Sequence, residues 1–303
     1  MPSLHPLYMG MAGNNGNLAA NRAIHDSDTV ILVGARIADR AVSQPQKMMA
    51  NKTLIHIDVD PAEIGKNAKC DLPIVGDAKA IFEELVKQEI NMRDMSAWTG
   101  ELADYRRKKS RRVTPDQFTD PAYFVNQLST HMSKDAVYVA DVGQNQIWSC
   151  ANVVMQEGRF LTSGGMGTMG YALPAAIGAK MADRNREVVA VSGDGGFQMA
   201  MMELATMNQE GLDLKLVVIN NETLGMVREA QHYSFGGRYT MVDLKGGPDY
   251  QQLAKAYRID YLRIENNDEV EEVITKFLAG KGSVLLEVIV DQDGIVRKAG
   301  GAK

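Results

Sequence analysis

Two apolar runs, each followed by small or polar residues, most constrain the fold of this chain. Residues 188–191 precede Gly193-Asp194-Gly195-Gly196, and residues 214–219 precede Asn220-Asn221. Such runs are typical of buried parallel strands, and the helical spacing of residues 199–209 joins them into a strand–helix–strand unit. Because open α/β sheets bind ligands at the carboxyl ends of their strands, we expect Asp194 and Asn221 to meet at one edge.

The side chains at this edge favour a hard cation. An Asp oxygen, an Asn oxygen and nearby backbone carbonyls form a set of oxygen ligands that suits Mg²⁺ shared with a diphosphate. Glycines beside Asp194 let the backbone approach phosphate groups closely. The sequence therefore predicts a site for a magnesium-bound diphosphate.

Composition excludes several classes of protein. With 303 residues the chain is long enough for two domains. A net charge of -5 gives no general attraction to nucleic acid or acidic membranes. Two cysteines, Cys70 and Cys150, fit a reducing compartment, and no apolar run approaches the roughly 20 residues that span a bilayer. We therefore expect a cytoplasmic protein that binds neither nucleic acid nor membranes.

Strand and helix patterns alternate along the whole chain, which predicts an α/β fold of two Rossmann-like three-layer α/β/α units with parallel sheets. Strand patterns at 28–34, 53–61 and 71–77 precede an amphipathic helix at 78–90. A second series begins near residue 120 and ends with a strand at 283–290. We expect domains at 1–93 and 120–303, joined by a linker at 94–119.

Two segments lack a clear pattern. The basic run at 106–112 is either a solvated helix end or a nucleic-acid-binding arm, and it contains no aromatic residue for stacking. Residues 222–247 are rich in Gly, His and Tyr with weak periodicity. A loop of this length in a compact domain is usually a lid or a binding loop.

Several motifs together resemble one family. A Gly-Asp-Gly turn followed, after a helix and a strand, by Asn-Asn resembles the motif of thiamine diphosphate enzymes. The blocks at 162–180 and 220–228, with Asp141-Val142-Gly143-Gln144, resemble the large catalytic subunit of acetolactate synthase (acetohydroxyacid synthase). His56-Ile57-Asp58 and Val75-Gly76-Asp77 resemble the middle domain of that family. The resemblance runs from about residue 2 to about residue 293.

The resemblance implies roles for individual residues. Asp194 and Asn221 would ligate Mg²⁺ through their side chains, and Thr223 would do so through its carbonyl. Met169 would wedge the cofactor into its bent form, the Gly167 carbonyl would accept a hydrogen bond from the aminopyrimidine, and Met226 would line the acceptor side. The residues expected to hold the diphosphate are Gly143, Gln144, Asn145, Gly193, Asp194, Gly195 and Gly196.

The resemblance implies a reaction and partners. Acetolactate synthases condense pyruvate with a second pyruvate or with 2-oxobutanoate, with loss of CO₂, in branched-chain amino acid biosynthesis. The family works as homo-oligomers with a small regulatory subunit. The alternatives are another thiamine diphosphate-dependent 2-oxo acid decarboxylase or oxidase, and a non-catalytic cofactor-binding fragment or partner subunit.

A flavin site is also implied by the resemblance. The residues that resemble FAD contacts of the family are Gly34, Ala35, Arg36, Arg40, Asp58 and Asp77. Two positions depart from the family pattern, since Asn15 stands where the family has histidine and Ala38 stands where it often has aspartate.

Other departures affect activity. The family places a further domain before this region, and that domain carries the glutamate that activates the cofactor. We therefore expect a fragment or one half of a split enzyme, with no catalytic residue of its own and little or no synthase activity alone. Ala230 stands where the biosynthetic enzymes usually place tryptophan, which predicts a roomier acceptor pocket.

Some of these residues also have simpler interpretations. Met169 alone could be core filling, and only its place in the glycine-rich block favours a cofactor contact. His232 is either a substrate contact in the lid or an exposed loop histidine. Asp141 is expected to cap a turn rather than perform chemistry. The other four histidines, His5, His25, His56 and His131, have no metal-ligand spacing and are expected to be structural.

Overall fold

The computed structural model describes residues 1–13, 16–38, 42, 44–90, 93–107, 114 and 116–294. The described residues divide between two compact units. Residues 6–107 belong to a smaller unit, and residues 1–5 and 114–294 belong to a larger one. Each unit has one sheet, of three and six strands respectively, and every pairing between strands is parallel. The predicted α/β fold with two parallel sheets is confirmed.

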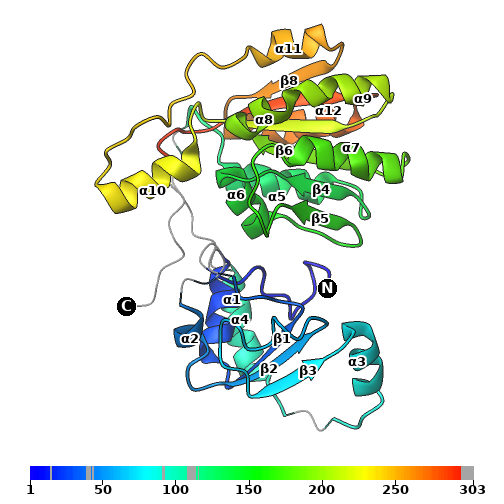
Figure 1. Ribbon diagram of the computed structural model, residues 1–303. Helices are drawn as coiled ribbons and strands as arrows, with labels where there is room; N and C mark the ends of the chain where they lie inside the picture. The colour runs from blue at the N-terminus through cyan, green and yellow to red at the C-terminus, as the bar shows by residue number, and fades with distance from the viewer. Residues whose placement is uncertain are drawn as a thin grey trace. The chain divides into compact units, whose positions relative to one another are not determined.

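The smaller unit is built on a sheet of order β1-β2-β3 (Figure 1). Its strands are β1 Thr29–Val33, β2 Thr53–Asp58 and β3 Leu72–Val75. Its helices are α1 Leu18–Asp26, α2 Pro45–Met48, α3 Ala78–Leu85 and α4 Ser96–Arg107. Asp77 begins α3 by accepting a hydrogen bond from the N–H of Ala80 at 3.0 Å, which satisfies one free donor of the first turn.

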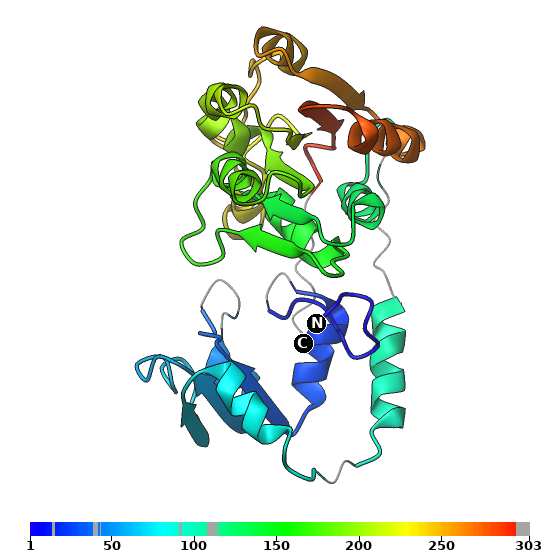
Figure 2. The same ribbon diagram turned by 90° about the vertical axis from the view of Figure 1, so that its right-hand side faces the viewer.

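Helix α4 lies in the segment predicted as a linker. It packs beside α1, as Figure 2 shows. Leu102 of α4 is buried, and the Arg22 guanidinium of α1 lies 5.7 Å from the centre of the Tyr105 ring. Trp98, Leu102 and Tyr105 recur at helical spacing, so a periodic signal for α4 was present in the sequence. Residues 108–113, which hold most of the basic run, lie outside the described part of the chain.

The larger unit is built on a sheet of order β5-β4-β6-β7-β9-β8. Its strands are β4 Val137–Ala140, β5 Arg159–Thr162, β6 Val188–Gly193, β7 Lys215–Asn220, β8 Asp260–Ile264 and β9 Val284–Ile289. The two opening apolar runs are thus β6 and β7, which pair directly. Five of the six residues in each of these strands are buried, because both faces of a parallel sheet are covered.

Helices cover both faces of this sheet (Figure 1). Residues of α5, α6 and α12 share one hydrophobic core with the sheet, while α7, α8, α9 and α11 share the other. The helices are α5 Pro121–His131, α6 Gln144–Asn152, α7 Ala172–Ala182, α8 Asp194–Ala200, α9 Leu204–Gln209, α10 Gly225–Phe235, α11 Tyr250–Ala256 and α12 Val270–Ala279, with short 3₁₀ turns at Met201–Glu203 and Asn267–Glu269. Among the described residues no helix is long and apolar enough to cross a membrane.

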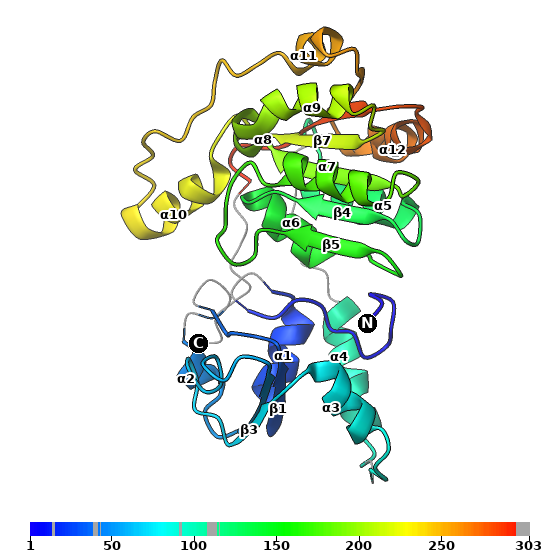
Figure 3. The same ribbon diagram turned by 45° about the vertical axis from the view of Figure 1, so that its right-hand side comes forward.

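The segment predicted as a lid contains a helix that periodicity did not reveal. Helix α10 extends past the end of the sheet in Figure 3 and has no buried residue. The chain that follows it is tied back to it. Gln231 donates to the carbonyl of Thr240 and accepts from the same residue's N–H, each at 3.0 Å. The Arg228 guanidinium lies 3.8 Å from the centre of the Tyr239 ring. His232 is exposed and contacts the Tyr239 hydroxyl at 2.9 Å.

Candidate functional site

The order of the strands creates a binding edge between β4 and β6. After β4 the chain crosses to β5 on one side, and it then returns to form β6 on the other side of β4. Ligands of open α/β sheets bind where the direction of strand order reverses, outside the carboxyl ends of the strands. The segments that leave β4 and β6 at this point carry Gly143 and Asp194.

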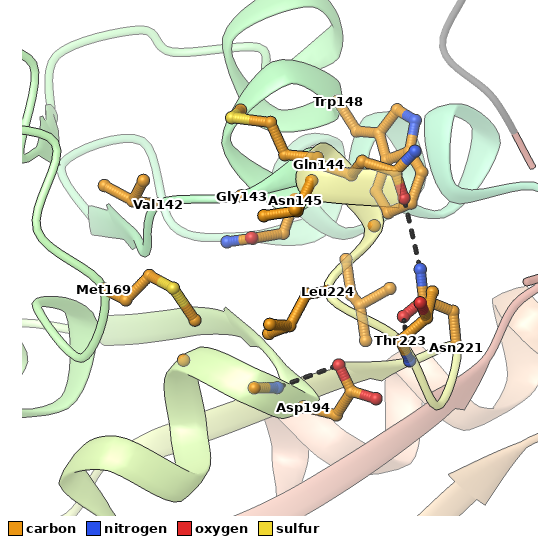
Figure 4. Close-up of a pocket in the computed structure, with 17 residues that line it drawn as sticks. Val142, Gly143, Gln144, Asn145, Trp148, Met169, Asp194, Asn221, Thr223 and Leu224 are labelled. Carbon is orange, nitrogen blue, oxygen red and sulfur yellow. Dashed lines mark hydrogen bonds between the residues drawn. The ribbon is translucent and has the colours of Figure 1, made fainter. Parts of the chain in front are cut away.

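A pocket lies at this edge (Figure 4). It is bordered by the ends of β4, β6 and β7 and by the first turns of α6, α8 and α10. The residues that line it are Val142, Gly143, Gln144, Asn145, Trp148, Met169, Gly193, Asp194, Gly195, Gly196, Ile219, Asn221, Thr223, Leu224, Gly225, Met226 and Val227.

Asp194 is a buried carboxylate with a free oxygen. It is the first residue of α8 and only 4% exposed. Its Oδ1 accepts a hydrogen bond from the Gly195 N–H at 2.9 Å, whereas its Oδ2 is buried and has no partner among the described residues. Burial raises the pKa of Asp194 to about 7, although the N–H groups of Gly195, Glu222 and Thr223 act in the opposite direction. A bound cation would satisfy the free oxygen and favour the ionised form.

The turn after β7 brings the second set of oxygens to Asp194. Glu222 has a φ of 52°, in the left-handed region, so the chain reverses sharply between Asn221 and Thr223. Asn221 is 8% exposed, and its Oδ1 accepts the Thr223 N–H at 3.2 Å. Thr223 is held in turn by its hydroxyl, which donates to the Val242 carbonyl at 2.9 Å.

Helix α6 begins at the pocket. Gly143 precedes it with a φ of 137°, which favours glycine, and a Cβ there would lie 2.8 Å from the Asn145 side-chain oxygen. Asn145 donates to the carbonyls of Asp141 and Val191 at 2.9 and 3.2 Å, and so ties β4 to β6. The Asn145 side chain therefore has a structural role. The backbone N–H groups of the first turn of α6 border the pocket and are suited to bind an anion.

Gln144 links three segments around the pocket. Its Oε1 accepts from Asn221 Nδ2 at 3.1 Å, and its Nε2 donates to the Gly294 carbonyl at 3.1 Å and to Glu229 at 3.4 Å. Gly225 passes so close that a Cβ there would lie 2.0 Å from the Gln144 oxygen. The start of α10 therefore lies directly against Gln144 and Asn221, with no room for a side chain at position 225.

Met169 lines the pocket (Figure 4) and lies close to Gly195. A Cβ on Gly195 would lie 2.7 Å from Leu224 and 3.4 Å from Met169. Gly195 and Gly196 form the first turn of α8 rather than the separate turn that the sequence suggested. All the predicted diphosphate and metal residues line the pocket, as do Met169 and Met226, whereas Gly167 is not among the lining residues.

Asp141 has a structural role, as expected from the sequence. Its carboxylate is fully buried and accepts the N–H groups of Gly170 and Ala172 at 2.9 and 2.8 Å. It also accepts from the Val142 N–H and, at 3.4 Å, from the Ser192 hydroxyl. Asp141 thereby fixes the end of the glycine-rich segment, which carries Met169, and the start of α7.

Sequence reasoning missed several lining residues, chiefly Trp148 and Leu224. Trp148 lies one helical turn after Gln144 on α6, so recognising that helix would have placed both on one face. Leu224 and Val227 belong to the turn and helix that follow Thr223, where no periodic signal exists. Only the tertiary structure brings them to the pocket.

Of the residues predicted to contact FAD, those that the structure describes lie at the carboxyl ends of the strands of the smaller sheet. Gly34 follows β1 with a φ of 58°, and Ala35 and Arg36 come next. The Asp58 carboxylate accepts the Asp60 N–H at 2.9 Å, while Asp77 caps α3. Both carboxylates thus stabilise local turns. Arg40 and Asn15 lie outside the described residues.

No group of three or more His, Cys, Asp or Glu residues suited to a metal occurs in the described part of the chain. A cation at the pocket would therefore need amide and carbonyl oxygens besides Asp194, together with oxygens of its ligand. That donor set matches a hard cation bound jointly with a diphosphate.

Comparison with known proteins agrees with this geometry. The thiamine pyrophosphate enzyme C-terminal TPP binding domain matches residues 141–288, and the thiamine pyrophosphate enzyme central domain matches residues 1–85. Similar proteins include acetolactate synthase large subunits of Cyanidium caldarium (36% identical, covering 94% of this chain and 50% of the relative) and of Lactococcus lactis subsp. lactis (37%, 96% and 51%). An acetolactate synthase of Mycobacterium leprae is 39% identical, covering 97% of this chain and 49% of the relative. The chain spans about half the length of these relatives.

Proposed function

Because this chain belongs to the thiamine pyrophosphate enzyme family, we propose that it forms part of an acetolactate synthase and holds the diphosphate end of thiamine diphosphate together with Mg²⁺. The observation that carries the proposal is the free, buried Oδ2 of Asp194 beside the Asn221–Thr223 turn. A cation there would neutralise a carboxylate that burial otherwise disfavours.

Each group at the pocket would have a distinct task. Asp194, the Asn221 side chain and the Thr223 carbonyl would ligate the cation. The start of α6 and the glycines of α8 would hold the phosphate oxygens, while Met169 would contact the rest of the cofactor. Thiamine diphosphate, when bound, would supply a carbon nucleophile that adds to a 2-oxo acid and a cationic ring that takes up the electron pair released when CO₂ leaves.

The relatives support condensation of two 2-oxo acids as the overall reaction. Met226 and α10 border the pocket and would form its acceptor side. No glutamate is among the 17 residues that line the pocket in the described part of the chain. We therefore propose that the glutamate acid of the family comes from a complementing domain, and that the chain works in a homo-oligomer or with a complementing chain, joined by a small regulatory subunit.

Cofactor binding can be measured through Trp148, which is 6% exposed and lines the pocket. The chain has two tryptophans, so Trp98→Phe leaves Trp148 as the single reporter. We expect thiamine diphosphate with Mg²⁺ to change its fluorescence saturably, and thiamine without the diphosphate to leave it unchanged. An equal response to both compounds, or a response that survives removal of divalent cations, would contradict the proposal.

The reaction itself is tested by its product. An assembled enzyme that contains this chain should convert pyruvate to acetolactate. Acetyl phosphate or free aldehyde as the main product would instead indicate an oxidase or a decarboxylase. We also propose FAD as a ligand of the smaller unit, which the visible absorbance of the purified protein would test directly.

A further inference from the structure

Next to the Asn221–Thr223 turn, three neighbouring strands carry a polar cluster centred on one buried carboxylate. Glu287 on β9 lies in register between Val218 of β7 and Arg263 of β8. Its side chain is 7% exposed in a region where the surrounding strand residues are mostly apolar. A carboxylate in such a place is costly unless it is paired and hydrogen-bonded.

Each oxygen of Glu287 has its own partner. Oε1 accepts a hydrogen bond from Asn220 Nδ2 at 2.7 Å. Oε2 accepts from the Tyr261 hydroxyl and lies 3.7 Å from an Arg263 nitrogen. The Arg263 side chain is 47% exposed, so its charge compensates the buried carboxylate from the surface. The cluster therefore has two arms: one is the contact of Oε1 with Asn220, and the other is the contact of Oε2 with Tyr261 and Arg263.

The Asn220 arm fixes the turn that presents the predicted cation ligands. Because Asn220 Nδ2 is held by Glu287, its Oδ1 is directed to the Glu222 N–H, which it accepts at 3.1 Å. Glu222 is the residue in the left-handed conformation between Asn221 and Thr223. The Asn220 amide thus holds the N–H side of this strained residue, while the Leu244 N–H donates to the Glu222 carbonyl at 2.8 Å.

We propose that Glu287 is a positioning residue for the cation: through Asn220 it holds the turn in the conformation that aims the Asn221 side chain and the Thr223 carbonyl at the pocket. Glu287 has no contact with the pocket and is not among its lining residues. The inference rests on the proposed function, because it assigns a task to the turn that the proposed cation uses.

The test measures binding of Mn²⁺, as a paramagnetic substitute for Mg²⁺, to the full chain in the presence of thiamine diphosphate. Glu287→Ala should weaken Mn²⁺ affinity on the order of tenfold, because a hydrogen bond to a charged group is lost. Glu287→Gln, whose amide oxygen can still accept from Asn220, should stay within about threefold of the parent. Asn220→Ala should match Glu287→Ala, and combining the two should add little, because both act on one contact.

Tyr261→Phe is the matched control, because it breaks the other arm of the cluster and leaves the Asn220 contact in place. We expect it to lower stability in urea much as Glu287→Ala does while Mn²⁺ affinity stays at the parental value. Parental affinity in Glu287→Ala, or an equal loss in Tyr261→Phe, would overturn the positioning role. If Glu287→Ala does not fold, parental affinity in Asn220→Ala would overturn it equally. A parent chain that binds no Mn²⁺ with thiamine diphosphate would refute the proposed function itself.

Discussion

Replacing Asp194 by asparagine should stabilise the metal-free protein at pH 8 while abolishing its response to the cofactor. Burial raises the pKa of Asp194 to about 7 from an ordinary value of 3.8. Between these two pH values the folded state keeps a proton that the unfolded state has lost, so the free energy of unfolding falls as pH rises and levels off above about pH 7. At about 1.36 kcal/mol per pH unit, the raised pKa costs on the order of 4 kcal/mol of stability at pH 8 and less than half of that at pH 5, where the folded state still keeps the proton.

Asparagine removes this pH-dependent cost. Its Oδ1 can keep the hydrogen bond from Gly195. Its amide nitrogen would take the place of the unpartnered Oδ2, and a buried donor without an acceptor lowers the free energy of unfolding by about 1–3 kcal/mol at every pH. Relative to the parent, Asp194→Asn should therefore gain about 3 kcal/mol of stability between pH 5 and pH 8. Saturating Mg²⁺ and thiamine diphosphate, at about 100 times Kd, should add about 2.7 kcal/mol to the parent and nothing to the variant.

Urea unfolding followed by Trp148 fluorescence, in the Trp98→Phe background, measures both effects. The parent and the variant are compared at pH 5 and pH 8, first without divalent cations and then with Mg²⁺ and thiamine diphosphate. A stability difference that does not change with pH would show that burial does not oppose the ionisation of Asp194. A variant that is still stabilised by the two ligands would show that Asp194 does not hold the cation.

Three further substitutions probe the rest of the site. Gly225→Ala should displace the Gln144 side chain, lower the free energy of unfolding in urea by about 1–3 kcal/mol and weaken thiamine diphosphate binding. Its control, Gly178→Ala, places a methyl group in open space on α7 and should raise the free energy of unfolding by about 0.5–1 kcal/mol. Equal effects of the two substitutions would contradict the close approach of Gly225 to Gln144. Asp141→Asn should cost about 3 kcal/mol in the same unfolding assay, because its amide nitrogen would face backbone donors, and a neutral result would refute the capping role. In an assembled enzyme, Ala230→Trp should shift acceptor choice toward 2-oxobutanoate by about tenfold, measured with both acceptors in competition; an unchanged product ratio would place position 230 away from the acceptor.

The strands and their polar ends could be predicted because they are local signals. Each apolar run of the larger unit is long enough for a buried strand, and a polar or glycine residue marks its end, as at Asp194 after β6. The prediction that Asp194 and the Asn221 turn lie at the same edge followed from one rule, that ligands of open α/β sheets bind at the carboxyl ends of the strands. Gly195 and Gly196 misled the prediction of a separate turn, since glycine usually interrupts helices but here begins α8.

Helix α10 could not be predicted from periodicity because it buries no face. It is held by contacts to residues that follow it, such as Gln231 with Thr240 and Arg228 with Tyr239. These pairings give no apolar spacing along the helix itself. The position of Leu224 in the pocket could not be predicted either, because its neighbours there, such as Gly195, belong to another strand–helix unit of the chain.

The position of β9 has a consequence for how the protein is made. β9 is the last strand of the described chain, yet it lies between β7 and β8 and pairs with both. While a ribosome is still adding residues before 284, β7 lacks one neighbour and β8 lacks its only one. The larger sheet therefore closes late in synthesis, and until then its open strands are exposed to mispairing. A chain cut short before residue 284 would retain Asp194 and Asn221 in sequence but would lack the strand that joins the two parts of the sheet.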